Sequence, residues 1–128
     1  MTELNKITET IIGSAIAVHQ ELGPGLLESA YEACLVYELL QRGLSIQQQK
    51  ALPVNYRGVK VECGYQIDLI VENNAIVELN AVERLEPIHE AQLLSYLKLS
   101  GYRVGLLINF NVKILKQGIK RLVNNLAD

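Results

Sequence analysis

The segment YQIDLIVENNAIVELNAVE, residues 65–83, places the strictest limit on how this chain can fold. It contains two apolar stretches that are typical of β-strands, separated by the three residues 72–74. Two of these three are asparagine, which tolerates the left-handed backbone of a tight turn, so the stretches are predicted to form a hairpin. Each predicted strand carries one acid within its apolar sequence, Asp68 in the first and Glu78 in the second. An acid is unusual inside an apolar strand, so these two residues are candidates for a functional site.

The length of the hairpin loop decides whether the two acids meet. Side chains alternate along a strand, and residues that face each other across an antiparallel pair point to the same side. A three-residue loop places Asp68 directly opposite Glu78, whereas a two-residue loop would place Asp68 opposite Leu79. The apolar pattern favours the three-residue loop, because it also aligns Leu69 with Val77.

Two carboxylates that face each other in a sheet repel one another. The repulsion costs on the order of 1 kcal/mol or more when the pair is partly buried, unless a cation or a proton lies between them. A divalent metal such as Mg²⁺ or Mn²⁺ would relieve it, since both ions prefer oxygen ligands. The alternative is that the acids are solvated at a sheet edge or paired with Arg or Lys, and the pattern alone leaves both interpretations open.

The rest of the chain predicts an α/β fold in which helices flank a mixed sheet of four or five strands. Apolar residues at helical spacing, with Gly and Pro at the ends, predict helices over residues 3–21, 26–42, 87–100 and 113–127. Short strands with a turn at Arg57–Gly58 precede the hairpin, and RVGLLINF at residues 103–110 reads as a strand buried on both faces. The passage from the second hairpin strand through a helix to this strand predicts a parallel crossover.

The apolar spacing also predicts which side of each of the first two helices faces the core. In the first helix the inner stripe consists of Ile7, Ile11, Ala15, Val18 and Leu22. In the second helix it consists of Leu27, Ala30, Cys34, Tyr37 and either Val36 or Leu40.

Composition limits the function classes. The 128 residues fit one domain, 1–128, and the net charge of −2 is not that of a strongly basic nucleic-acid-binding protein. No run of 18 apolar residues occurs, and the N-terminal residues lack the apolar core of a signal peptide. We therefore expect a soluble cytoplasmic protein with no membrane partner. The sequence leaves open whether it forms a homo-oligomer or binds a protein partner.

Several motifs together resemble one known family. GLLESAYE at residues 25–32 is similar to the motif that names the GxxExxY family, a branch of the PD-(D/E)xK nuclease superfamily. The hairpin resembles the superfamily's core, which has an Asp, then a turn, then Glu-x-Lys. LPVNYRGVKV, residues 82–110 and GIKRLVN also resemble the family, so the resemblance covers nearly the whole chain.

The resemblance implies a restriction-endonuclease-like core and a set of site residues. Glu28 corresponds to an acid from a helix before the sheet, and Asp68 and Glu78 correspond to the metal-binding acids of the hairpin. The carbonyl of Leu79 is a further expected ligand of Mg²⁺ or Mn²⁺. Gln92, with Tyr96 one helical turn later, corresponds to a pair that lies against the site in related nucleases.

One position departs from the family pattern. Asn80 stands where the superfamily has a catalytic Lys, and Asn can donate a hydrogen bond but carries no positive charge. Loss of such an electrostatic group typically costs about two to three orders of magnitude in rate. Lys60 shares the parity of Asp68, but we expect it to be a poor replacement, because Gly64 interrupts the strand register between the two residues.

Two functions follow as expectations. The first is a Mg²⁺-dependent nuclease acting on DNA or RNA, with Glu28, Asp68, Glu78, Asn80 and Gln92 in the site. The second is an inactive nuclease-like domain that binds nucleic acid or a protein partner, which Asn80 and the mild acidity favour. His19, His89 and the basic residues of the predicted terminal helix are minor candidates, for which packing or solvation is the simpler interpretation.

Overall fold

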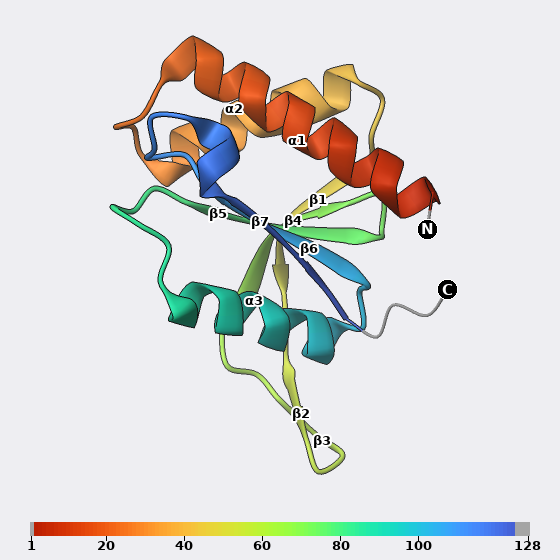
Figure 1. Cartoon of the computed structure of the whole chain (residues 1–128). Helices are drawn as coiled ribbons and strands as arrows, with labels where there is room; N and C mark the ends of the chain where they lie inside the picture. The colour runs from red at the N-terminus through yellow and green to blue at the C-terminus, as the bar shows by residue number, and fades with distance from the viewer. Residues whose placement is uncertain (1, 125–128) are drawn as a thin grey trace.

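The structure, a computed structural model, describes residues 2–124. Its elements follow the order helix, helix, five strands, helix, strand, short 3₁₀ helix and strand (Figure 1). Their bounds are α1 Thr2–Leu22, α2 Glu28–Gln41, β1 Ile46–Ala51, β2 Val54–Tyr56, β3 Val59–Val61, β4 Gln66–Val71, β5 Ala75–Asn80, α3 Pro87–Ser100, β6 Val104–Asn109, η1 Leu115–Gly118 and β7 Ile119–Val123.

Five of the strands form one mixed sheet in the order β1-β4-β5-β6-β7. Strands β5 and β6 are parallel and are joined through α3, while every other neighbouring pair in this sheet is antiparallel. The remaining strands, β2 and β3, form a separate two-stranded hairpin that extends from β1 and β4 past α3 (Figure 1). The predicted α/β fold with a mixed sheet and a parallel crossover is confirmed.

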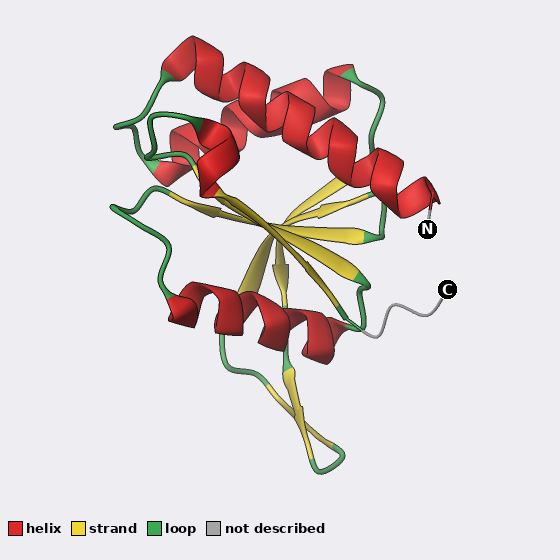
Figure 2. Ribbon diagram, viewed as in Figure 1, coloured by secondary structure: helices red, strands yellow, loops and turns green. Residues whose placement is uncertain are grey.

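Helices cover both faces of the sheet. Figure 2 shows α1 and α2 on one face and α3 alone on the other. Each face has its own apolar cluster: Leu35 and Val77 lie in the cluster beneath α1 and α2, and Ile76 and Leu93 in the cluster beneath α3. All six residues of β6 are buried, as expected for a strand covered on both faces.

The hairpin has the register that the apolar pattern predicts. Val71 pairs with Ala75 and Leu69 pairs with Val77, so the loop holds three residues. Glu72 and Asn73 in this loop have left-handed backbones, with φ of 54° and 52°. The predicted register, with Asp68 across from Glu78, is therefore confirmed.

The predicted inner side is confirmed for α1 and wrong for α2. Ile11, Ala15 and Val18 of α1 are buried, but α2 buries a different stripe from the predicted one, Tyr31, Leu35 and Leu39. The predicted residues Leu27, Tyr37 and Leu40 are exposed. Apolar residues surround most of α2, so spacing alone fits more than one stripe, and tertiary packing selects among them.

The predicted terminal helix over residues 113–127 is also wrong. A 3₁₀ turn, Leu115–Gly118, is followed by strand β7, which pairs antiparallel with β6 from Ile108↔Ile119 to Val104↔Val123. A Cβ on Gly118 would lie 2.4 Å from the carbonyl oxygen of Asn109, so the chain approaches the end of β6 closely at this glycine. Pairing with a buried strand overrides the local helical spacing. Residues 125–127 of the predicted helix lie outside the described part.

Candidate functional site

The two hairpin acids hold each other's strands through the backbone. The N–H of Asp68 donates to Oε2 of Glu78 at 2.9 Å, and the N–H of Leu79 donates to Oδ2 of Asp68 at 2.9 Å. The backbone pairing of β4 and β5 reaches as far as Leu69↔Val77. Beyond that pair, each carboxylate accepts a hydrogen bond from a backbone N–H of the other strand. The acids therefore lie where the two strands separate.

A third acid lies close to these two and comes from helix α2, outside the sheet. Glu28 is the first residue of α2, and its carboxylate forms a hydrogen bond with the backbone of Ala81, just beyond β5. It is also close enough to Asp68 for the two charges to interact. Glu28 therefore lies beside the hairpin acids, as the sequence predicts.

The Tyr of the GxxExxY motif fixes the loop that leads into Glu28. Tyr31 is fully buried, and its ring stacks on Phe110 with centroids 4.5 Å apart. Its hydroxyl donates to the carbonyl of Gly23 at 2.6 Å and accepts from the N–H of Leu26 at 3.1 Å. The Gly of the motif, Gly25, has φ of +100°, which other residues rarely adopt. The motif thus sets the position at which α2 begins.

A fourth acid, Glu32, and a glutamine complete the cluster. Gln49 of β1 donates from Nε2 to Oδ1 of Asp68 at 3.1 Å and to Oε1 of Glu32 at 3.0 Å. Gln48 also donates to Glu32, at 3.1 Å. Gln49 has a left-handed backbone, with φ of 49°, and the β1–β4 pairing skips it. The register is the same on both sides of this residue, with Gln48 opposite Leu69 and Lys50 opposite Ile67, so Gln49 lies across from Asp68.

Burial and mutual repulsion raise the pKa of three of the acids. Burial and then the charge of Asp68 raise the pKa of Glu78 from 4.5 to about 8. Burial raises the pKa of Asp68, opposed by its hydrogen bonds from Leu79 and Gln49. Although Glu28 as a residue is exposed, partial burial of its carboxylate and the charge of Asp68 raise its pKa as well. Such a group of perturbed acids is typical of functional sites.

Helix α3 also brings polar side chains close to the acids. Gln92 donates from Nε2 to the hydroxyl of Tyr96 at 3.0 Å, so the predicted pair is formed. Burial and then the charge of Glu78 raise the pKa of Tyr96, which places this side chain near the acids. His89 accepts a hydrogen bond at Nδ1 from the N–H of Glu86 at 2.8 Å and lies close enough to Glu28 to lower the pKa of that acid.

The remaining candidates lie as follows. Asn80 is half-buried at the end of β5, two residues beyond Glu78, and its carbonyl accepts from the N–H of Phe110 at 2.9 Å. Lys60 is exposed on β3 and lies 3.4 Å from Glu62. His19 is buried, with Nε2 2.7 Å from the carbonyl oxygen of Val112, which is a packing role. Lys120, expected on a terminal helix, lies on β7, 3.6 Å from Glu90.

The donor set suits a hard cation, although it is not arranged as a preformed cage. Across residues 2–124, no group of three or more His, Cys, Asp or Glu side chains could hold a metal ion as they stand. Asp68 and Glu78 instead accept backbone hydrogen bonds. The carboxylates of Glu28, Asp68 and Glu78 are nevertheless the oxygen ligands that Mg²⁺ and Mn²⁺ prefer, and a cation would relieve the repulsion that raises their pKa values.

Comparison with protein families matches residues 5–122 to the PD-(D/E)XK nuclease superfamily. The chain belongs to the PD-(D/E)XK nuclease superfamily. Nucleases of this superfamily commonly use divalent metal ions. Comparisons with curated proteins and with solved structures gave no significant match.

None of the helices within residues 2–124 is long and apolar enough to cross a membrane.

Two residues of the acid cluster, Glu32 and Gln49, were not predicted from the sequence as site residues. Glu32 shares a helix face with Glu28, four residues away, which is a signal that spacing could have supplied. Gln49 gave no such signal, because it is one of three consecutive glutamines and only the β1–β4 register places it across from Asp68. The pairing of β1 with β4, which brings Gln49 to Asp68, joins segments about twenty residues apart and depends on the fold.

Proposed function

We propose that this protein is a metal-dependent nuclease of the GxxExxY branch, which hydrolyses phosphodiester bonds in DNA or RNA. The observation that carries the proposal is the meeting of Glu28, Asp68 and Glu78 from one helix and two strands, with each pKa raised. Supporting it are the superfamily membership over residues 5–122 and the Gln92–Tyr96 pair beside the acids.

In this proposal Glu28, Asp68 and Glu78 hold Mg²⁺ or Mn²⁺, with the carbonyl of Leu79 as a further ligand. The bound ion would lower the pKa of a coordinated water and offset negative charge on the scissile phosphate. Gln49 holds the Asp68 carboxylate in place from β1. Gln92 fixes the Tyr96 hydroxyl at the edge of the site.

Asn80 favours a second candidate function, a nuclease-like domain that binds nucleic acid or a protein partner without cutting. It occupies the position of the superfamily's catalytic Lys, and its amide can donate a hydrogen bond but cannot supply a charge. Lys60 does not offer an obvious replacement, since it lies on the separate β2–β3 hairpin beside Glu62. Metal binding does not require this Lys, so the two functions differ in cleavage and not in metal affinity.

A cleavage assay separates the two. Supercoiled plasmid, a labelled single strand of DNA and a labelled single strand of RNA are incubated with the protein and either Mg²⁺ or Mn²⁺. The nuclease proposal expects cleavage that disappears with Asp68→Asn and with chelator. Metal binding without cleavage of any substrate supports the binding domain instead, and cleavage that persists in Asp68→Asn contradicts the proposed site.

A further inference from the structure

A groove runs along the exposed side of α3 and reaches the acid cluster at one end. It has a volume of about 320 Å³ and lies between α3 and the stem of the β2–β3 hairpin. The side chains that matter for its chemistry are Val54, Tyr65, Ile88, Gln92, Tyr96 and Leu99. We propose that this groove, the aromatic groove, binds an unpaired base, so that the nucleic acid taken by this site is single-stranded. The inference rests on the proposed function and deepens it.

Two tyrosines give the aromatic groove its binding surface. The rings of Tyr65 and Tyr96 have centroids 5.9 Å apart and are tilted by 58°. Tyr96 is buried in α3, whereas Tyr65 is 45% exposed. Ile88 and Leu99, on the same side of α3, are also exposed, at 70% and 38%. An exposed aromatic ring beside apolar side chains is the surface on which bases of single strands stack.

The aromatic groove is continuous with the acid cluster through two side chains. Gln92 and Tyr96 line the groove, and Tyr96 lies near enough to Glu78 to respond to its charge. A phosphodiester held at the acids would therefore place a neighbouring base at the groove. A base within a duplex is paired and stacked on both faces, so only an unpaired base can lie against these rings.

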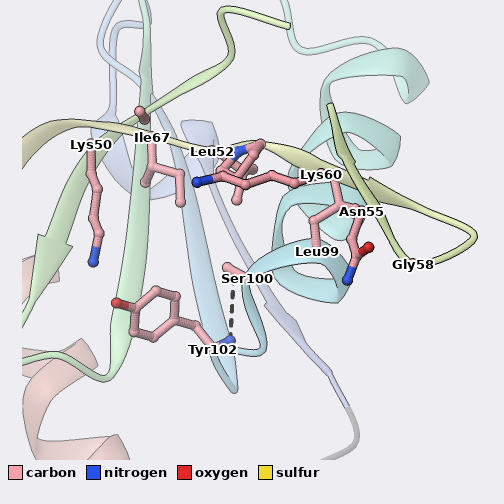
Figure 3. Close-up of a pocket in the computed structure, with 11 residues that line it drawn as sticks. Lys50, Leu52, Asn55, Gly58, Lys60, Ile67, Leu99, Ser100 and Tyr102 are labelled. Atoms are coloured by element: carbon pink, nitrogen blue, oxygen red, sulfur yellow. Dashed lines mark hydrogen bonds between the residues drawn. The ribbon is translucent and has the colours of Figure 1, made fainter. Parts of the chain in front are cut away.

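A second cavity continues this path beyond the groove. Leu99 lines both cavities, and the second has a volume of about 460 Å³ (Figure 3). Lys50 of β1 and Lys60 of β3 line it together with Asn55, while Ser100 and Tyr102 line it from the end of α3. Two ammonium groups in one cavity suit a phosphate of the same strand, although Lys60 also lies 3.4 Å from Glu62.

The overall charge agrees with a binding mode based on stacking. The chain has a net charge of −2, so it lacks the excess of positive charge by which proteins grip the two backbones of a duplex. Stacking depends little on charge and on base sequence. The ligand class is therefore a single strand of DNA or RNA without strong sequence preference.

Binding is tested in the full chain carrying Glu78→Gln, which removes one proposed metal ligand and so separates binding from cleavage. Fluorescence anisotropy measures the affinity for a labelled single strand and for the duplex of the same sequence. The single strand should bind more tightly. Tyr65→Leu should weaken its binding about tenfold, the size of one stacking contact, while Tyr65→Phe should retain it. Tyr37→Leu, which removes a still more exposed tyrosine ring on α2, is the matched control and should leave the affinity unchanged.

Two further variants test whether other residues of the two cavities contribute to binding. Ile88→Ser alters an exposed residue of the same groove and should also weaken binding, without risk to the core. Lys50→Gln with Lys60→Gln should weaken binding and reduce its dependence on salt. Duplex binding as tight as single-strand binding, no binding of either, or an unchanged affinity in Tyr65→Leu would overturn the inference. Single-strand binding with the expected Tyr65 dependence, but no cleavage by the wild type, would instead contradict only the proposed nuclease activity.

Discussion

Glu78 accepts a hydrogen bond at 2.9 Å from the backbone N–H of Asp68, the residue that faces it across the hairpin. The N–H of Leu79 in turn donates to Asp68, so each acid satisfies a donor of the opposite strand. Two acids inside an apolar hairpin are thereby held side by side at the point where β4 and β5 separate. The arrangement holds the two carboxylates close enough to Glu28 for the charges to interact, and we propose that a cation binds where the strands separate.

Restoring the missing lysine is expected to increase cleavage. Asn80→Lys places a positive charge two residues beyond Glu78, where it can stabilise the developing negative charge on a phosphate. We expect the rate of plasmid nicking to rise by about two orders of magnitude. The matched control, Gln20→Lys, adds the same charge at an exposed position of α1 and should leave the rate unchanged. An equal rise in both variants would mean that charge acts through substrate attraction and not at the site.

The hairpin was predictable from sequence because its register depends on the parity of one loop and on the alternation of apolar residues. Val71 and Ala75 pair as that parity requires. The strand β7 was not predictable, because Ile119 and Leu122 fit a helical stripe and only the pairing with β6 makes them a strand. Likewise Gln49 reaches Asp68 only because β1 pairs with β4 in a register that places the two residues opposite each other. Local patterns thus identified the acids, whereas long-range pairing supplied what holds them.

The raised pKa of Glu78 predicts how stability depends on pH. Between its ordinary value of 4.5 and its value of about 8 in the fold, Glu78 keeps a proton that the unfolded chain has released. The folded state then binds more protons than the unfolded state, so the free energy of unfolding falls as pH rises through this window, and Glu78 alone contributes at most about 1.4 kcal/mol per pH unit. Urea denaturation across the window measures it.

The same series in Glu78→Gln identifies the group responsible. The glutamine side chain of this variant cannot ionise, and its amide oxygen can still accept from the N–H of Asp68, so the slope should become clearly shallower. Some slope should remain, because burial also raises the pKa of Asp68 and of Glu28. A free energy of unfolding that rises with pH across the window in the wild type is the opposite of what we expect.

The buried hydroxyl of Tyr31 is expected to stabilise the fold and the position of Glu28. Tyr31→Phe keeps the stack on Phe110 but leaves the carbonyl of Gly23 and the N–H of Leu26 without this partner. We expect a loss of about 1–3 kcal/mol in the free energy of unfolding, measured by urea denaturation. Tyr37→Phe removes an exposed hydroxyl from the same helix and should change stability by less than about 0.5 kcal/mol. Equal effects of the two variants would argue against the anchoring role.

The most direct measurement is a calorimetric titration of Mn²⁺ and Mg²⁺ into the wild-type chain and into Asp68→Asn and Glu78→Gln. If the acids form one cation site, the wild type binds and each variant loses affinity by about tenfold or more. Glu9→Gln, which removes an exposed acid of α1, should bind as the wild type does. An equal affinity for the metal ion in the wild type and in Glu78→Gln, or no binding by the wild type, would contradict the proposal that Glu28, Asp68 and Glu78 together hold a metal ion.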